Sequence, residues 1–318
     1  LPQSDWPGLL ALPEKPWLTL CLVQSIADVS ESDLAVARGV LAVPPVNHAV
    51  FEALLTEMPR CCWIHSFSAG VDGIASILRG LPQHIAVSNG RGAFTSSLAE
   101  FAFAAALHFN KQIPRCLANR EQGKWEKFTM NTMRGKTLGL LGYGSIAKAT
   151  ATLGVAFGMR IITLRRDVSK PAVGREVVPE ATYGYADGDT FFAASDFVVC
   201  TLPATAETVH FVSDKAFATM KQTAVFISLG RGAVVDERAL FDALQGGRIA
   251  GAALDVFERE PLPAESPLWT CEKLLLTAHN ADLTADYFEL GWSTFLQNAD
   301  AIHRGGELVT PVDRSLGY

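Results

Sequence analysis

The chain has 318 residues and a mass of 34.2 kDa, so two domains are expected, although one long domain is possible. Hydrophobic residues make up 49% of the sequence and charged residues 19%, which excludes a disordered or low-complexity chain. The net charge of −6 argues against nucleic acid or an anionic membrane as the main partner, because both select a basic surface.

The sequence carries no targeting or membrane-spanning signal. No basic segment followed by an apolar core begins it, and no apolar run approaches the ~18 residues that cross a bilayer. The six cysteines lack metal-binding spacing, so reduced, buried thiols and no metal site are expected. A cytoplasmic protein is therefore predicted. An organelle stays open, as does a trimmed start, because the first residue is not Met.

Apolar runs of strand length alternate with helix-like segments over the first hundred residues. Four such runs predict strands, at residues 17–23, 39–43, 61–67 and 84–88. The run HAVFEALLTEM predicts an intervening helix, and the Ala-rich residues 95–113 predict a longer one that Pro114 would end. Apolar strands separated by helices are typical of a parallel sheet covered on both faces.

A second alternating series begins after Met133. Residues 137–142 predict a strand, 145–157 a helix and 159–164 the next strand. Four more predicted strands follow, at residues 196–202, 224–229, 249–257 and 274–278. This is the doubly wound pattern, and a final helix is expected to carry the chain back to the first domain.

The predicted fold class is therefore α/β, with two Rossmann-like or flavodoxin-like doubly wound parallel-sheet domains and a cleft between them. Residues 1–107 and 284–318 are expected to form a substrate-binding domain. Residues 108–283 are expected to form a dinucleotide-binding domain.

The turn after the strand at 137–142 has the G-x-G-x-x-G/A form of the dinucleotide fingerprint. It reads Gly142, Tyr143, Gly144, Ser145, Ile146, Ala147. Gly142 permits the tight turn, Gly144 lets the backbone approach a pyrophosphate, and Ala147 lets the helix pack close to the strand. The pattern alone also fits an ordinary turn, but the strand before it and the helix after it favour dinucleotide binding.

The stretch ITLRRD places Arg165 21 residues after Gly144, where an NAD-binding protein carries an acidic residue for the ribose hydroxyls. Guanidinium groups at Arg165 and Arg166 would instead bind a 2′-phosphate through charge-assisted hydrogen bonds. NADP(H) is therefore the expected coenzyme, with NAD(H) possible. The alternatives are a solvated basic turn and ribose binding by Asp167.

Four chemically capable residues follow the carboxyl ends of successive predicted strands, where open α/β sheets bind ligands: Arg231, Asp255, Glu260 and His279. Reduction of a 2-oxo acid needs a cation for the carboxylate, which Arg231 would supply, and a proton donor, which His279 would supply. Glu260 would keep His279 protonated by raising its pKa. Taken singly, His279 also fits a packed or capping residue, and Arg231 fits a surface residue.

The segments FSAGVDGI, GRGAVVDERAL, GAALDVFEREPLP and LLLTAHNAD resemble those of the D-isomer-specific 2-hydroxyacid dehydrogenases, which include glyoxylate/hydroxypyruvate reductases. The resemblance implies that Arg231, Glu260 and His279 are the catalytic set. It implies that Arg231 and the main-chain N–H groups of Ala69 and Gly70 bind the substrate carboxylate. It also implies a homodimer built around the long helix after residue 95, and a small 2-oxo or 2-hydroxy acid as substrate.

The coenzyme-binding positions combine the fingerprint, the arginine pair and residues that the resemblance implies, with Asp255 near the nicotinamide carboxamide. They are Gly142, Tyr143, Gly144, Ser145, Ile146, Arg165, Arg166, Leu202, Pro203, Asp255 and Ala281. The sequence departs from the family around its histidine, where Ala278 replaces a usual proline and Asn280, Ala281 and Asp282 replace usual glycines. Candidates for substrate side-chain selection are Trp63, Phe67, Arg91 and Trp125.

The leading prediction is an NADPH-dependent reductase that converts small 2-oxo acids, first glyoxylate and hydroxypyruvate, to D-2-hydroxy acids. One alternative is an NAD-dependent dehydrogenase that oxidises a D-2-hydroxy acid. Another is a dinucleotide-sensing, corepressor-like interaction protein without turnover, against which the intact Arg231, Glu260 and His279 argue.

Overall fold

A computed structural model of the chain describes residues 15–171, 173–174, 176–314 and 316–317. The chain divides into two compact units. Unit 1 contains the described residues up to Phe94 and from Thr284 onward, and unit 2 spans Thr95–Leu283. The first boundary lies at Thr95, not after residue 107 as expected, because helix α5 (Thr95–Asn110) packs along α7 (Ser145–Ala156) of unit 2.

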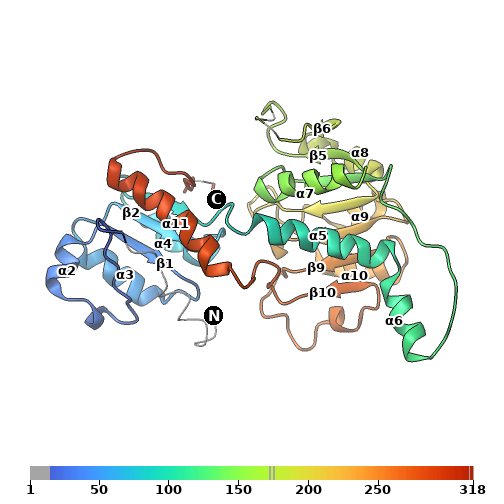
Figure 1. Cartoon of the computed structure of the whole chain (residues 1–318), viewed down its shortest axis with the longest axis horizontal. Coiled ribbons are helices and arrows are strands. Elements are labelled where there is room, and N and C mark those ends of the chain that lie inside the picture. Colours follow the sequence, from blue (N-terminus) through green and yellow to red (C-terminus); the bar gives the residue numbers. More distant parts are fainter. Residues whose placement is uncertain (1–14, 172, 175, 315, 318) are drawn as a thin grey trace. The chain divides into compact units, whose positions relative to one another are not determined.

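Unit 1 is built on a three-stranded parallel sheet in the order β1-β2-β3. Figure 1 labels β1 and β2 of this sheet. The strands are β1 (Gly39–Ala42), β2 (Trp63–Ser66) and β3 (Ala86–Asn89). The helices are η2 (Ile26–Asp28), α2 (Glu31–Val36), α3 (His48–Glu57), η3 (Asp72–Ile74), α4 (Ala75–Gly80) and α11 (Tyr287–Arg304). Helix α11 packs against β3, so the predicted return of the last helix to the first domain is confirmed.

The strand expected at residues 17–23 does not form, and that prediction is wrong. Within the described residues, this part of the chain makes one isolated antiparallel bridge, between Lys15 and Leu18. Leu20 and Leu22 are 42% and 48% exposed. An apolar segment does not form a strand on that basis alone, because the backbone N–H and C=O groups of a strand need a neighbouring strand as partner.

His65 of β2 is an ionisable side chain buried in unit 1. It is 0% exposed, and its Nδ1 lies 2.7 Å from the Ser88 hydroxyl oxygen. Its Nε2 has no hydrogen-bond partner among the described residues. Burial lowers the pKa of His65 from 6.5 to about 3, because the charged ring would lose its hydration. The ring is therefore neutral at physiological pH.

Replacing His65 with glutamine is expected to make unit 1 less sensitive to acid. The unfolded chain takes up a proton at His65 near pH 6.5, but the folded protein does so only near pH 3. Stability is therefore complete above pH 6.5 and falls below it, by about 2 kcal/mol at pH 5. Urea unfolding at pH 7 and pH 5 measures this loss. Other acidic and basic groups titrate in both proteins, so His65→Gln should lose less unfolding free energy between pH 7 and pH 5 than the wild type. An equal loss in the two proteins would contradict the prediction.

Unit 2 is built on a seven-stranded parallel sheet in the order β10-β9-β8-β7-β4-β5-β6. Figure 1 labels β5, β6, β9 and β10 of this sheet. The strands are β4 (Thr137–Leu141), β5 (Arg160–Leu164), β6 (Ala181–Tyr183), β7 (Phe197–Cys200), β8 (Val225–Ser228), β9 (Gly251–Leu254) and β10 (Leu274–Leu276). Chain order reverses at β4, between β5 and β7. Parallel sheets bind ligands at the carboxyl ends of strands beside such a reversal.

Helices cover the sheet of unit 2 on both faces. Besides α5 and α7, the helices of unit 2 are α6 (Ile113–Glu121), η4 (Tyr185–Asp187), α8 (Gly188–Ala194), α9 (Asp214–Thr219), η5 (Gly232–Val234), α10 (Glu237–Gln245) and η6 (Pro267–Thr270). Val198 and Val199 of β7 pack in different hydrophobic clusters, because successive side chains of a strand point to opposite faces. The doubly wound α/β fold predicted for this part of the chain is confirmed.

The exposure of the cysteines and the length of the helices bear on two further expectations. Cys61, Cys200 and Cys271 are buried free thiols, as expected, whereas Cys21 is exposed and Cys62 and Cys116 are partly exposed. Across the described ranges, every helix is too short or too polar to span a bilayer.

Candidate active site

The predicted dinucleotide fingerprint forms a tight turn between β4 and α7 at the sheet's switch point. Gly142 has a φ of 90°, which favours glycine. A methyl group there would lie 3.1 Å from the Thr201 hydroxyl oxygen and 3.2 Å from Leu202 Cδ2. The turn therefore contacts the segment that follows β7, and Leu202, a predicted coenzyme contact, lies beside it.

The start of α7 fits a dinucleotide pyrophosphate. Gly144 is the N-cap of α7. Because glycine has no side chain, no N-cap side chain accepts a hydrogen bond from the first N–H groups of this helix. A methyl group on Gly144 would meet no heavy atom within 4 Å, so a ligand can approach the backbone there. The first N–H groups of a helix lack internal partners, and those of Ser145 and Ile146 would hold the pyrophosphate.

Arg165 lies just after β5, beside Tyr143 of the fingerprint. Its guanidinium carbon is 5.9 Å from the centre of the Tyr143 ring, and its Nη2 donates a hydrogen bond to the Lys170 carbonyl oxygen. Its Nε is buried without a hydrogen-bond partner among the described residues. A buried donor on a charged group favours an acceptor, and a phosphate oxygen is a suitable one.

Asp167 is engaged by its own turn. Its carboxylate accepts hydrogen bonds from the Ser169 N–H at 3.0 Å and from the Ser169 hydroxyl at 2.6 Å. The Ser169 hydroxyl is also the main reason that the pKa of Asp167 is lowered. These bonds weaken the alternative in which Asp167 binds the ribose.

His279 and Glu260 form a direct pair. The His279 Nδ1 lies 2.7 Å from Glu260 Oε2, and Glu260 Oε1 accepts a hydrogen bond from the Phe257 N–H at 2.9 Å. The bond to Glu260 raises the pKa of His279, although burial opposes the rise. Burial would raise the pKa of Glu260, but the bonds from His279 and Phe257 outweigh it and lower that pKa. This pair keeps a protonated imidazole available.

Asp255 fixes the backbone that carries His279. It is 1% exposed, and its Oδ1 accepts hydrogen bonds from the Asn280 N–H at 3.0 Å and the Ala281 N–H at 3.2 Å. The Thr277 hydroxyl donates to the same oxygen at 2.6 Å. Thr277 was missed in the sequence, where a hydroxyl two residues before a histidine carries no distinctive signal.

Two glycines bring Arg231 to this site. A methyl group on Gly230 would lie 2.4 Å from the Leu202 carbonyl oxygen, and one on Gly232 would lie 1.9 Å from the Phe257 carbonyl carbon. The chain on either side of Arg231 therefore touches the backbone of neighbouring strand ends. Gly232 contacts Phe257, whose N–H is bonded to Glu260, and Glu260 is bonded to His279, so the three predicted catalytic residues lie on neighbouring loops of unit 2.

The other predicted residues of unit 2 surround these loops. The Pro203 carbonyl oxygen accepts a hydrogen bond from the Thr208 hydroxyl at 2.6 Å, and the Ala281 carbonyl oxygen accepts one from the Ser97 hydroxyl at 2.5 Å. Asp282, where the family usually has glycine, is partly buried. Burial raises its pKa, and the charge of His279 opposes the rise. The departures from the family therefore place a carboxyl group close to the histidine.

In unit 1, Ala69 and Gly70 lie in the loop after β2. The Asn89 side chain donates a hydrogen bond to the Ala69 carbonyl oxygen at 2.6 Å, and the Ser66 hydroxyl donates to the Gly70 carbonyl oxygen at 3.2 Å. Both carbonyls are thus bound by side chains at the ends of β2 and β3, which holds the loop in shape.

Two candidates for substrate selection are core residues instead. Trp63 is 6% exposed and stacks on Phe295, and Phe67 is 0% exposed and packs edge-on against Trp292. Both rings instead anchor α11 to the sheet of unit 1. Trp125 is 93% exposed.

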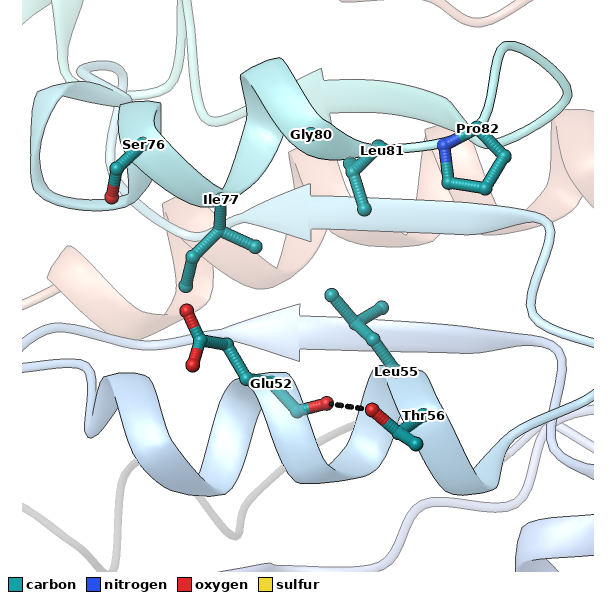
Figure 2. Close-up of a pocket in the computed structure, with 8 residues that line it drawn as sticks. All are labelled: Glu52, Leu55, Thr56, Ser76, Ile77, Gly80, Leu81 and Pro82. Carbon is teal, nitrogen blue, oxygen red and sulfur yellow. Dashed lines mark hydrogen bonds between the residues drawn. The ribbon is translucent and has the colours of Figure 1, made fainter.

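A surface pocket of unit 1 is lined by none of the site residues described so far. It is bordered by α3 and by the segment from α4 to Pro82, and Glu52, Leu55 and Ile77 point toward it (Figure 2). The Thr56 hydroxyl donates to the Glu52 carbonyl oxygen within its wall at 2.9 Å. None of the predicted catalytic or coenzyme-binding residues lines this pocket.

Comparison with known proteins agrees with this fold. The family model for the NAD binding domain of D-isomer specific 2-hydroxyacid dehydrogenase matches residues 103–281. Glyoxylate reductase of Korarchaeum cryptofilum is 32% identical over 274 residues, which cover 83% of this chain and 79% of that protein. Hydroxypyruvate reductase of Thermotoga maritima is 35% identical over 251 residues, which cover 78% and 75%.

Solved structures resemble the chain over almost its whole length. An NADPH-dependent glyoxylate/hydroxypyruvate reductase from Sinorhizobium meliloti, in complex with NADP and sulfate, has a TM-score of 0.83 and 25% identity, covering 100% of this chain and 97% of that one. A D-isomer specific 2-hydroxyacid dehydrogenase from Xanthobacter autotrophicus Py2, in complex with NADPH and MES, has a TM-score of 0.82 and 28% identity, covering 99% and 96%.

The fold and these relatives define an NAD(P)-dependent oxidoreductase. The chain belongs to the D-isomer specific 2-hydroxyacid dehydrogenase family, in its glyoxylate/hydroxypyruvate reductase-like branch.

Proposed function

We propose that the protein reduces small 2-oxo acids, such as glyoxylate and hydroxypyruvate, to D-2-hydroxy acids with NADPH. The observation that carries this proposal is the 2.7 Å pair of His279 and Glu260 beside Arg231, at the carboxyl ends of a dinucleotide-binding sheet. A proton donor kept charged by a carboxylate suits reduction of a carbonyl, because the product oxygen must gain a proton. Relatives named glyoxylate and hydroxypyruvate reductase support the substrate class.

In this proposal each residue has a distinct role. The coenzyme, when bound, supplies hydride to the carbonyl carbon. Arg231 binds and orients the substrate carboxylate with its planar guanidinium group. Since His279 Nδ1 is bonded to Glu260, Nε2 is the ring atom that delivers a proton to the substrate oxygen. Asp255 keeps the His279 backbone in place through its bonds to Asn280 and Ala281, and a contact of Asp255 and Ala281 with the nicotinamide end remains part of the proposal.

The proposal also includes a role for unit 1. The main-chain N–H groups of Ala69 and Gly70 are proposed ligands of the substrate carboxylate. The support is their position in a loop whose carbonyl groups are bound by the side chains of Asn89 and Ser66.

A homodimer is proposed as well. As the resemblance implies, it would be built around the long helix α5. Three apolar side chains in the segment that follows α5 are exposed and support the proposal, with Leu117 44%, Trp125 93% and Met130 43% exposed, because exposed apolar surface can mark an association site. A cytoplasmic location stays a prediction from the sequence.

The coenzyme preference is expected to depend on the arginine pair. A charge-assisted hydrogen bond of about 1.5–3 kcal/mol corresponds to a preference for NADPH over NADH of roughly ten- to a hundredfold in kcat/KM. Arg165→Ala/Arg166→Ala should abolish this preference, mainly by lowering kcat/KM for NADPH. Steady-state oxidation of NADPH and NADH with glyoxylate and with hydroxypyruvate measures both values.

A second double variant separates this effect from a general loss of positive charge. Arg238 and Arg304 are exposed and pair with Asp242 and Asp300 in their own helices. Arg238→Ala/Arg304→Ala removes the same charge and should keep the NADPH preference. A wild type that uses NADH as well as NADPH would refute the coenzyme assignment. A wild type that consumes neither coenzyme would refute the substrate class.

A further inference from the structure

A second cation and a carboxylate lie beside Arg165 in unit 2. Lys148, in the second turn of α7, has its Nζ 2.7 Å from Glu176 Oε1. Glu176 belongs to the loop between β5 and β6, and the carbonyl oxygen of the next residue, Val177, accepts a hydrogen bond from Tyr143. Arg165 lies over the Tyr143 ring, so these four side chains surround one place at the edge of the fingerprint.

The Glu176 carboxylate is held there as an anion. Its Oε2 accepts a hydrogen bond from the Val173 N–H at 3.0 Å, which closes the loop around it. The bond from Lys148 is the largest cause that lowers the pKa of Glu176, and the charge of Arg165 adds to it. The carboxylate is therefore ionised at neutral pH and lies in the field of both cations.

A 2′-phosphate would compete with this carboxylate for the same donors. A phosphate monoester carries about −1.5 to −2 charges at pH 7 and three strong acceptor oxygens, so it can bond several cationic groups at once. The buried Nε of Arg165, without a partner among the described residues, is one available donor, and Lys148 Nζ is another. Two anions cannot share this site without repulsion, so Glu176 must withdraw when a phosphate enters.

We propose that Lys148 is a third cation of the coenzyme-phosphate site and that Glu176 is its resident counterion, displaced by the 2′-phosphate of NADPH. This inference rests on the proposed function, in which Arg165 binds that phosphate. It makes Glu176 a residue that weakens binding of the phosphorylated coenzyme and leaves the unphosphorylated one unaffected. If the ion pair of Lys148 and Glu176 only stabilises the loop, its loss should weaken the binding of NADPH and NADH equally.

Direct binding measurements test the inference without turnover. Isothermal titration calorimetry gives Kd values for NADPH and NADH, and for the fragments 2′,5′-ADP and 5′-AMP, which differ in the 2′-phosphate. Glu176→Gln should tighten NADPH and 2′,5′-ADP by about two- to fivefold, as expected for a partly exposed ion pair, with NADH and 5′-AMP unchanged. Lys148→Met should raise the Kd of NADPH and 2′,5′-ADP, which carry the 2′-phosphate, and leave the Kd of NADH and 5′-AMP unchanged.

The control is Asp189→Asn, because Asp189 is an exposed acid of unit 2 that pairs with Lys215. This variant removes the same charge and should leave all four Kd values unchanged. Glu176→Gln values equal to wild type, or equal weakening of NADPH and NADH, would overturn the inference while the proposed function stands. A wild type that does not distinguish 2′,5′-ADP from 5′-AMP would overturn the coenzyme part of the proposed function itself, and the inference with it.

Discussion

Replacing His279 with asparagine is expected to lower kcat for glyoxylate reduction by about 10²–10⁴, the usual contribution of a positioned acid or base. Asparagine suits the test because His279 has a φ of 50°, a conformation that asparagine tolerates well. The loss is then due to the missing proton donor and not to a refolded loop. Stopped-flow or steady-state kinetics, with the coenzyme Kd measured in parallel, separates turnover from binding, and the Kd should not change.

The pH profile gives an independent check on the same pair. In the proposed function, reduction needs the protonated imidazole, so activity should fall as pH rises through the pKa of His279. The bond to Glu260 raises that pKa, and Glu260→Gln should therefore move the fall to lower pH. His84→Ala, which removes an exposed histidine of unit 1, should change neither kcat nor the profile. Wild-type turnover in His279→Asn, or an unmoved profile in Glu260→Gln, would show that another group donates the proton.

Replacing Gly232 with alanine is expected to damage both folding and catalysis. The added methyl group would lie 1.9 Å from the Phe257 carbonyl carbon and 2.4 Å from the Glu258 nitrogen, and neither backbone atom can rotate away. Overpacking of this kind costs about 1–3 kcal/mol or more. At about 2–4 °C per kcal/mol for a domain of this size, the unfolding temperature should fall by several degrees.

Catalysis should suffer through Glu260. The Phe257 N–H donates to Glu260 Oε1, so a shift of Phe257 moves the carboxylate that holds His279. A misplacement of about 1 Å in a reacting group can cost roughly 10² in kcat/KM. Gly188→Ala is the matched control in unit 2, because its methyl group would lie 3.8 Å or more from other atoms. If Gly232→Ala matched this control in melting temperature and in kcat/KM, the close contact would not constrain the site.

Most strands of both sheets could be predicted because each is a short apolar run between turn signals. The runs at β4, β7 and β8 are buried on both faces, and this burial is what an uninterrupted apolar sequence indicates. Strand β6 was missed because its three residues are partly exposed at the sheet edge and carry no such pattern. A strand was wrongly predicted at residues 17–23 for the opposite reason, because these residues are apolar but have no neighbouring strand to pair with.

The site was predictable where its chemistry is local in the sequence or matches a family pattern. The spacing from Gly142 to Ala147 implies the turn directly, and the pairing of Glu260 with His279, implied by the resemblance, is present in the structure. The contact of Gly232 with Phe257 and the ion pair of Lys148 with Glu176 carry no such signal. Each joins segments more than twenty residues apart, and only the folded chain brings them together.

The left-handed backbone of His279 means that stability and reactivity favour different residues at this position. A non-glycine residue in that conformation stores about 1–3 kcal/mol of strain, which is sustained by the hydrogen bonds that the Asn280 and Ala281 N–H groups donate to Asp255. Glycine would release the strain and remove the ring that donates the proton in the proposed function. Under that function, selection for thermostability alone would lead away from catalysis at this position.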